Sequence, residues 1–392
     1  MEFEKSNVQS QLEEVVLPFW LSLEDHTYGG FYGKVAADLS IDRQADKSAI
    51  LMTRYLWALS AAYTHTKNPE LLSAATQTYQ FIAEKMLDKE YQGIYWSVTH
   101  DGQPANTQKH IYVQSFAIYA LSEYYRISKD PSSLDLAIKL FELIESQCYM
   151  PSVNGYHEEF TVEWEKSEAT VMGPKGQVDY FSTNAVLHLL EAYTNFYTVY
   201  PQAEVLDRLS NLLTIFKTHI IAESGHCRTE FDHQWQAINA DVSYAHDIET
   251  AWLLYRATEV IGQATKAEYL EMINRIVKAV VAEGLDAQGI ILDHLQLGEK
   301  SHIKQWWSLA ESVIGFQDAY SRTADQKYQA LAQVHWQFIQ QYLFSSDQVS
   351  EWLPHVDEQG QVVTSRSTNM SDGWKGPYHT VRMYVELLNR LS

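Results

Sequence analysis

Two kinds of apolar segment alternate along the chain, and this alternation constrains the fold more than any other feature. Segments of the first kind carry apolar residues at alternating steps of three and four, the period of a helix with one buried face. In 70–87 these positions are Leu72, Ala75, Tyr79, Ile82 and Met86. The same spacing marks 133–147, 204–221, 266–282 and 326–343, and more weakly 8–20. We expect six amphipathic helices there, each with one face in solvent.

Segments of the second kind are apolar or small on almost every side, so each is expected to be a helix buried on most sides. They occupy 50–63, 111–125, 181–197, 244–260, 306–321 and 376–391. Successive starts are 61, 70, 63, 62 and 70 residues apart, which is a loose internal repeat. An open solenoid would expose one face of each such helix. The pattern therefore predicts an all-α fold, a single (α/α)6 barrel with six inner helices inside six outer ones.

The chain of 392 residues shows no linker. Its nine prolines and seventeen glycines are scattered, and 46% of the residues are hydrophobic, which is ample for one large core. We therefore expect residues 1–392 to form one domain.

Charge and terminal composition exclude several classes of partner. The net charge of −21 repels phosphate backbones and anionic lipids, so neither nucleic acid nor a membrane is an expected partner. Residues 1–20 lack a basic stretch followed by an apolar one, and no apolar run approaches the roughly 20 residues of a membrane span. Cys148 and Cys227 have no CxxC partner, so neither a disulfide framework nor a thiolate metal site is expected. We expect a cytoplasmic protein, either a monomer or a homodimer, that acts on a small molecule.

The links that precede the buried helices are mostly long and carry glycine and aromatic residues, as in 29–33, 93–98, 155–160 and 351–355. Such stretches are typical of short hairpins. They gather at the end of the barrel where the inner helices start. Because loops on a rigid scaffold commonly carry the chemistry, we expect the functional site at that end.

Polar residues lie on the helices that should be most apolar, and burying them is costly unless they are partnered. His246 and Glu249 share a helix face at i, i+3, and Glu249 is expected to orient His246 and raise its basicity. Asn184 and His188 share a face at i, i+4, as do His379 and Arg382 at i, i+3. Taken alone, the His246–Glu249 pair could equally be a satisfied structural pair in the core, and a lone histidine at position 188 would more often be structural.

The remaining inner helices contribute Arg54, Tyr112, Trp306, Trp307 and Glu311, of which Trp307 is interpreted as a core residue. All six helices thus offer a polar group near the same end, and three of these groups are histidines, which suit acid–base work near neutral pH. A single site shared by the six helices explains this pattern better than six unrelated structural polar groups.

A metal or cofactor is not expected. Three histidines and a glutamate match a zinc or iron ligand set by residue type, but no HExxH spacing occurs. The chain also lacks phosphate-binding glycine motifs and a nucleophile elbow.

An ordered set of motifs resembles the N-acylglucosamine 2-epimerase superfamily, and within it the cellobiose 2-epimerase branch, over nearly the whole chain. The matching stretches are Pro18–Trp20, Gly29–Gly33, Ala45–Lys47, Arg54 with Leu56–Trp57, Gly93–Trp96, Phe116–Ser122, Asn184–Tyr193, Tyr244–Glu249, Trp306–Trp307 with Ala310–Glu311, and Trp374–Lys375 with Pro377–His379.

The resemblance implies an (α/α)6 barrel that epimerises an aldose at C2 without a cofactor. It implies a catalytic set of Arg54, His188, His246, Glu249 and His379. The substrate-binding residues that it implies are Tyr112, Asn184, Trp306, Glu311 and Trp374. In such an enzyme Arg54 and His188 would stabilise a cis-enediolate, and His246 and His379 would serve opposite faces of C2.

Substrate and outcome stay open at this point. Lys375 and Gly376 stand before Pro377 and Thr380 follows His379, where disaccharide epimerases typically have cysteine before the proline and asparagine after the histidine. The superfamily also contains mannose 2-epimerases and aldose–ketose isomerases that act on mannose. Two rivals from other classes remain: a glycoside hydrolase using Glu249 and Glu311, and a sugar-binding protein without turnover.

Overall fold

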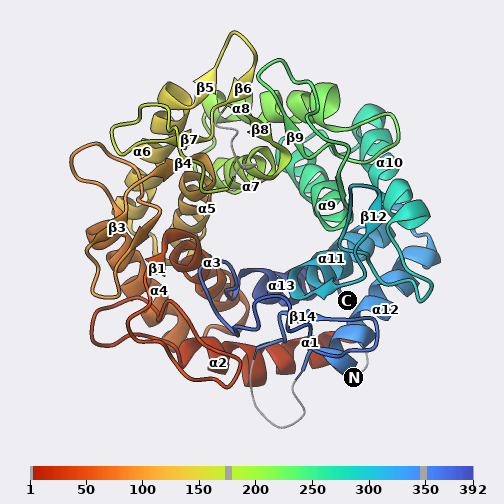
Figure 1. The fold of residues 1–392 in the computed structure, drawn as a ribbon, viewed down its shortest axis with the longest axis horizontal. Coiled ribbons are helices and arrows are strands. Elements are labelled where there is room, and N and C mark those ends of the chain that lie inside the picture. Colours follow the sequence, from red (N-terminus) through yellow and green to blue (C-terminus); the bar gives the residue numbers. More distant parts are fainter. Residues whose placement is uncertain (1–2, 173–178, 345–350, 392) are drawn as a thin grey trace.

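The fold is a double ring of helices. The computed structural model describes residues 3–172, 179–344 and 351–391. In this part of the chain, six helices form an inner ring (Figure 1): α3 (Ala49–Thr66), α5 (Ile111–Ser128), α7 (Thr183–Val199), α9 (Tyr244–Val260), α11 (Trp306–Thr323) and α13 (Tyr378–Arg390). Each packs against the next, and α13 packs against α3, so the ring is closed. All six lie on the segments predicted to be buried on most sides, and the prediction of a mainly helical protein is confirmed.

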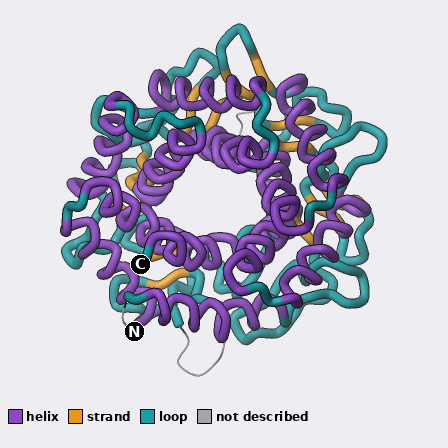
Figure 2. Tube along the Cα trace, turned by 180° about the vertical axis from the view of Figure 1, so that it is seen from behind, coloured by secondary structure: helices purple, strands orange, loops and turns teal. Residues whose placement is uncertain are grey.

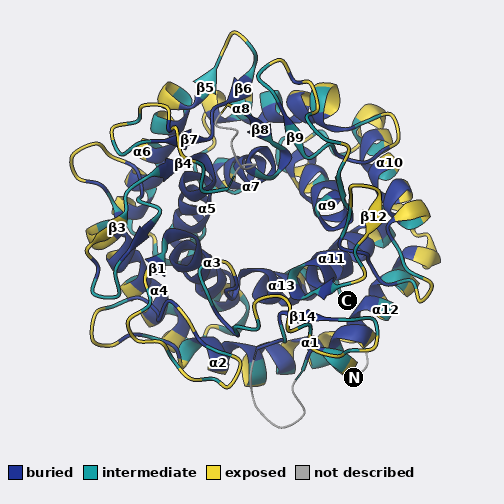
Figure 3. Cartoon of the chain, in the orientation of Figure 1, coloured by how far each residue is buried: buried dark blue, intermediate teal, exposed yellow. Residues whose placement is uncertain are grey.

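The outer helices lie on the amphipathic segments. They are α1 and α2 (Lys5–Gln11 and Leu17–Leu21, joined by the π-helical turn η1, Leu12–Val16), α4 (Pro69–Phe81, extended by η2, Ile82–Met86), α6 (Pro131–Gln147), α8 (Ala203–Ile215, extended by η3, Phe216–Ile220), α10 (Ala267–Glu283) and α12 (Gln326–Tyr342). Each of α4 to α12 packs against the inner helix that precedes it, whereas α1 packs against α13. Figure 3 shows the result, with a buried inner ring and outer helices exposed on one side. The view from behind shows the same closed ring (Figure 2).

The buried stripe of α4 and η2 differs slightly from the predicted one. Leu71 is fully buried, whereas Leu72 is only half-buried. The rest of the stripe, including Tyr79, Ile82 and Met86, is buried as predicted.

The links between helices are asymmetric, as predicted. Inner helices are followed by short links such as 67–68, 129–130 and 324–325, whereas the links before inner helices are long. The long links carry strands of two or three residues: β1 (Lys47–Ser48), β2 (Ser97–Val98), β3 (Pro104–Asn106), β4 (Lys109–His110), β5 (Tyr149–Met150), β6 (Gly155–Tyr156), β7 (Glu159–Phe160), β8 (Phe181–Ser182), β9 (Glu230–Phe231), β10 (Val242–Ser243), β11 (His294–Gln296), β12 (Glu299–Lys300), β13 (Lys304–Gln305) and β14 (His355–Val356).

The expectation that these stretches form local hairpins is only partly right. β2–β3, β5–β6 and β11–β12 are hairpins, but most pairs join neighbouring repeats. The strand that leads into an inner helix pairs with the link of the next repeat: β1 with β2, β4 with β7, β8 with β9, β10 with β11, and β13 with β14. A bridge between Val35 and Ser371 joins the last repeat to the first. These ladders satisfy backbone groups between repeats and hold the start of each inner helix in place.

Serine caps define where several inner helices begin. Three serine side chains each accept a hydrogen bond from the backbone N–H of the residue three positions later: Ser48, Ser182 and Ser243. Such N-caps stabilise a helix start by about 1 kcal/mol each. The first turns of the inner helices therefore lie at fixed positions around one end of the ring.

Candidate active site

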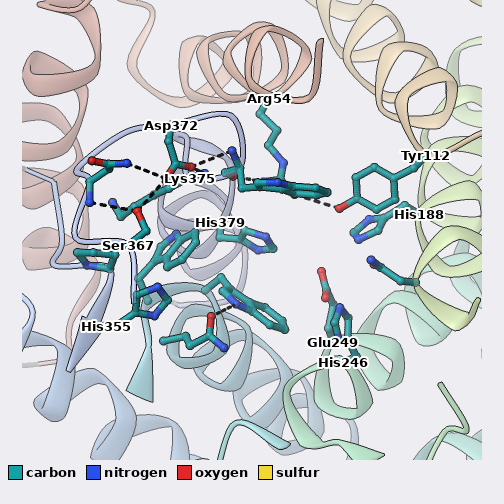
Figure 4. A pocket seen from close by; sticks show the side chains of 17 residues that line it. Arg54, Tyr112, His188, His246, Glu249, His355, Ser367, Asp372, Lys375 and His379 are labelled. Atoms are coloured by element: carbon teal, nitrogen blue, oxygen red, sulfur yellow. Dashed lines mark hydrogen bonds between the residues drawn. The ribbon is translucent and has the colours of Figure 1, made fainter. Parts of the chain in front are cut away.

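A cavity of about 330 Å3 opens at the end of the ring where the inner helices start. Its volume is in the range of small-molecule sites. The side chains that line it come from the six inner helices, from β13 and from the segment between α12 and α13 (Figure 4): Arg54, Tyr112, Asn184, His188, His246, Glu249, Gln305, Trp306, Trp307, Pro354, His355, Ser367, Asn369, Asp372, Trp374, Lys375 and His379. The predicted common cavity is present, and of the predicted site residues Glu311 alone is not among these lining side chains.

Equivalent positions of four inner helices supply charged or ionisable groups in and just behind the cavity. Arg54, His188, Glu249 and Glu311 are each the sixth residue of their helix, in α3, α7, α9 and α11. Two of these residues, Glu249 and Glu311, bring carboxylate oxygens close together, and both accept from Arg382. The four positions together supply one guanidinium, one imidazole and two carboxyl groups.

Arg54 and Tyr112 form one wall. The Arg54 guanidinium donates to the Trp374 carbonyl and, at 3.1 Å, to the Tyr112 hydroxyl oxygen. Burial raises the pKa of Tyr112 to about 12, so its hydroxyl stays protonated near neutral pH. The Tyr112 ring also packs edge-on against His188, with ring centroids 4.9 Å apart. This wall therefore offers a fixed cation and a hydroxyl donor.

Two of the histidines are held by carboxylates. His188 Nδ1 lies 2.9 Å from Glu191 Oε2, and His379 Nδ1 lies 2.8 Å from Glu311 Oε1. Glu311 therefore acts behind the cavity, through His379, rather than in its lining. Burial and the Arg382 charge together hold the pKa of His379 well below its usual range.

His246 has a different partner from the one that its spacing suggested. Its Nδ1 lies 2.7 Å from the Ser243 hydroxyl, while Glu249 accepts a hydrogen bond from Arg382. The expectation that Glu249 orients His246 is therefore wrong, because a buried guanidinium attracts the carboxylate more strongly than a neutral ring does. Burial, together with the charge of His188, lowers the pKa of His246 to about 4.

Arg382 connects the buried carboxyl groups around the cavity. It is fully buried and donates to Glu191, Glu249 and Glu311. Burial and the neighbouring Glu311 raise the pKa of Glu249 to about 7, despite the Arg382 charge. Glu249 can therefore gain or lose a proton near neutral pH.

The carboxylates around Arg382 are also potential metal ligands. Glu249, Glu311 and His379 bring three potential ligand atoms close together. The guanidinium already donates to both carboxylates, so a cation there would have to displace a buried arginine. The expectation that the site works without a metal stays a prediction.

Trp307 lines the cavity and is not the core residue expected from its sequence. Its ring centroid lies 4.8 Å from that of His246 and 5.6 Å from that of His379. Its Nε1 donates to Gln305 at 3.0 Å. The two histidines thus flank one indole ring, although they belong to different helices.

The segment before α13 supplies a wall of which the sequence indicated Trp374 but not the turn that holds it. The carboxylate of Asp372 accepts from the backbone N–H groups of Trp374 and Lys375 and from Ser367 Oγ. This turn places the half-exposed Trp374 ring at the rim of the cavity. His355 also lines this wall; the stretch that ends in it was expected near the site, but with no role for its side chain.

The double ring of helices and its cavity of paired histidines and carboxyl groups define an enzyme of proton transfer on a small polar substrate. Residues 30–382 match the family model described as N-acylglucosamine 2-epimerase, and the chain belongs to that family. It is 34% identical to a cellobiose 2-epimerase of Bacteroides fragilis over 388 residues, covering 98% of both chains. These findings confirm the expected enzyme class, a carbohydrate epimerase or isomerase.

Solved structures agree with this assignment. The cellobiose 2-epimerase of Bacillus thermoamylovorans superposes with a TM-score of 0.95 at 33% identity, covering 99% of both chains. A D-mannose isomerase superposes with a TM-score of 0.87 at 20% identity, which shows the fold alone. Among the described helices, none is long and apolar enough to cross a membrane.

Proposed function

We propose that the protein epimerises an unmodified gluco- or manno-configured aldose at C2. The first candidate substrate is the reducing-end glucose of a β-1,4 disaccharide such as cellobiose, and the second is free mannose or glucose. We further propose that residues 1–392 act as one domain of the (α/α)6 barrel class. The closed inner ring, with α1 packed on α13, supports that assignment.

The proposal rests on the two histidines that flank Trp307. Epimerisation needs one group to remove H2 and another to return a proton to the opposite face. In both His246 and His379 a neighbouring side chain occupies Nδ1, which leaves Nε2 of each ring for the substrate. Their pKa values are lowered, so both are neutral bases near pH 7.

Ring opening supplies the second proton. One imidazole accepts the O1 hydroxyl proton as the ring opens and becomes the acid that later protonates C2. The other imidazole removes H2. Glu249, whose pKa is about 7, is available to give a proton to O5.

The enediolate formed at C1 and C2 carries negative charge, and a preorganised cation stabilises such charge best in a buried site. Arg54 and His188 supply that environment, and the Tyr112 hydroxyl adds a donor beside them. These groups are already oriented by the Trp374 carbonyl and by Glu191, so they need no rearrangement.

The rim favours a disaccharide. Trp374 is 43% exposed at the rim, and the faces of such rings suit a second sugar unit. The relatives named cellobiose 2-epimerase, 34% and 33% identical over nearly the whole chain, support the same substrate.

An aldose–ketose isomerase is the second candidate, because it would form the same enediolate and return the proton to C1. Two observations support this candidate: a D-mannose isomerase has the same fold, and Lys375–Gly376 departs from the motif typical of disaccharide epimerases. A glycoside hydrolase would need two carboxylates flanking a bond, whereas Glu249 and Glu311 both bind Arg382.

The experiment is incubation of the protein with cellobiose, lactose, mannose, glucose and N-acetylglucosamine, followed by NMR of the products. We expect the C2 epimer of a disaccharide or of mannose. A ketose as the main product supports the second candidate. Released monosaccharide from cellobiose supports the hydrolase, and binding without turnover on the whole panel supports a sugar-binding protein; either would overturn the proposal.

A further inference from the structure

His157, between β6 and β7, is a buried histidine without a hydrogen bond of normal geometry among the described residues. Its side chain is 3% exposed, and both ring nitrogens lack such a hydrogen bond. Burying an imidazole in this way costs free energy, since its donor and acceptor lose their bonds to water. A buried polar group left so is expected to serve a ligand.

Two further ligand groups face His157. The Asp179 Oδ1 atom lies 4.0 Å from His157 Nδ1, and the His233 ring centroid lies 5.8 Å from that of His157. His233 Nε2 is also buried without a partner. One ligand atom from each of the three residues lies within 4.8 Å of the others.

The backbone holds these three residues in place. Asp179 stands just before β8 and His233 just after β9, and these strands pair through Phe181 and Phe231. His157 lies beside β7, whose Glu159 pairs with His110 of β4. The cluster therefore joins links from two neighbouring repeats that the ladders already position.

We propose that His157, Asp179 and His233 form a binding site for Zn²⁺ or a similar borderline divalent cation. Two imidazole nitrogens and one carboxylate oxygen are a common zinc set, with water in the fourth position. Burial lowers the pKa of His157 to about 4 and also lowers that of His233, so both are in the neutral form that metals bind.

Lys166 competes for the same carboxylate. Its Nζ lies 3.1 Å from Asp179 Oδ1, and both side chains are more than half exposed. An exposed ion pair of this kind is weak, so a cation can displace the ammonium group. Removing the lysine charge should therefore tighten metal binding.

The site stands apart from the proposed chemistry. None of its three residues lines the main cavity, so zinc there should raise the melting temperature without being needed for turnover. The test does not depend on the substrate assignment.

The experiment is calorimetric titration of tag-free, chelator-stripped protein with ZnCl2 at pH 7, with MgCl2 and CaCl2 as oxygen-preferring controls. We expect one Zn²⁺ per chain and no binding of Mg²⁺ or Ca²⁺. His157→Ala and His233→Ala should each lose at least the roughly 10–100-fold in affinity that loss of a supporting group costs. Lys166→Gln should bind more tightly than the unmodified protein.

His302→Ala is the matched control, because His302 is an exposed histidine that pairs with Glu358 at 2.6 Å elsewhere on the surface. It should bind Zn²⁺ unchanged. If His157→Ala does not fold, the half-buried His233→Ala decides alone, with circular dichroism as the folding check. Equal zinc binding in His233→Ala and the unmodified protein, or no zinc binding at all, would overturn the proposal.

Discussion

Replacing Arg382 by methionine should destabilise the protein strongly. The change keeps much of the side chain's apolar length but removes the charge shared by Glu191, Glu249 and Glu311. Taking one partner from a buried ion pair costs about 3–5 kcal/mol. At the average unfolding entropy per residue, that loss lowers the melting temperature of a chain this long by about 4–6 °C.

The pH dependence gives the prediction a second, independent readout. Without Arg382 the carboxyl groups should have folded-state pKa values above their unfolded values, so the folded state binds more protons. Stability of the variant should then fall as pH rises from 5 to 8, by up to about 1.4 kcal/mol per pH unit for each proton.

Differential scanning calorimetry at several pH values measures both effects. Arg256→Met is the control, since Arg256 forms an exposed pair with Glu259 and should shift the melting temperature by about 1 °C or less. If Arg382→Met melts within 1 °C of the unmodified protein at pH 8, the central charge network does not have the energetic role argued for it.

Three further predictions concern metal, substrate length and pH. Turnover should survive exhaustive chelation, because Arg382 already occupies the carboxylates near His379; a loss restored only by zinc, manganese or iron would contradict this. Trp374→Ala should raise KM for cellobiose more than for mannose, with kcat less affected, if the rim binds a second sugar ring; steady-state kinetics on both sugars decides. His335 accepts the Ile291 N–H, and burial lowers its pKa to about 4, so the unfolded chain binds a proton first and stability is lost as pH falls from 6.5 to 4. In His335→Asn the slope of unfolding free energy over that range should be shallower by about 1.4 kcal/mol per pH unit, and an unchanged slope would rule out the residue as its source.

Much of the fold was predictable because the sides of a helix that are buried determine which of its positions are apolar. The segment 50–63 has no polar face, and α3 is buried there as expected. The ladders between repeats were not predictable, because a strand as short as Lys47–Ser48 has no period and its partner is about fifty residues away. The π-turns at 82–86 and 216–220 likewise continue the helical spacing without any change of pattern.

The cavity was predictable for a related reason, since polar groups on buried helices must meet partners. Which partner each meets was not. His188 and Glu191 share the i, i+3 spacing of His246 and Glu249, yet only the first pair is bonded. The difference comes from Arg382, which reaches Glu249 from another helix.

Apart from Trp374, the wall before α13 escaped prediction because an irregular segment carries no periodic signal. Asp372 is the residue that could have been found. An aspartate two residues before a tryptophan and followed by glycine is typical of an Asx turn, and its carboxylate does accept the Trp374 and Lys375 N–H groups.

The roles of His246 and His379 are tested most directly by running the reaction in D2O and locating the label by NMR. The unmodified enzyme should place deuterium at C2 of the epimer. Turnover by His246→Asn and by His379→Asn should each fall by more than the roughly 10²–10⁴-fold typical of one general acid–base, because each histidine also moves the O1 proton when the ring opens or closes. Glu249→Gln should be milder, because it removes only the proton given to O5. Label at C1 of a ketose would instead indicate the isomerase. Near-normal epimerisation by both histidine variants, or C2 hydrogen that never exchanges with solvent, would contradict the two-histidine account.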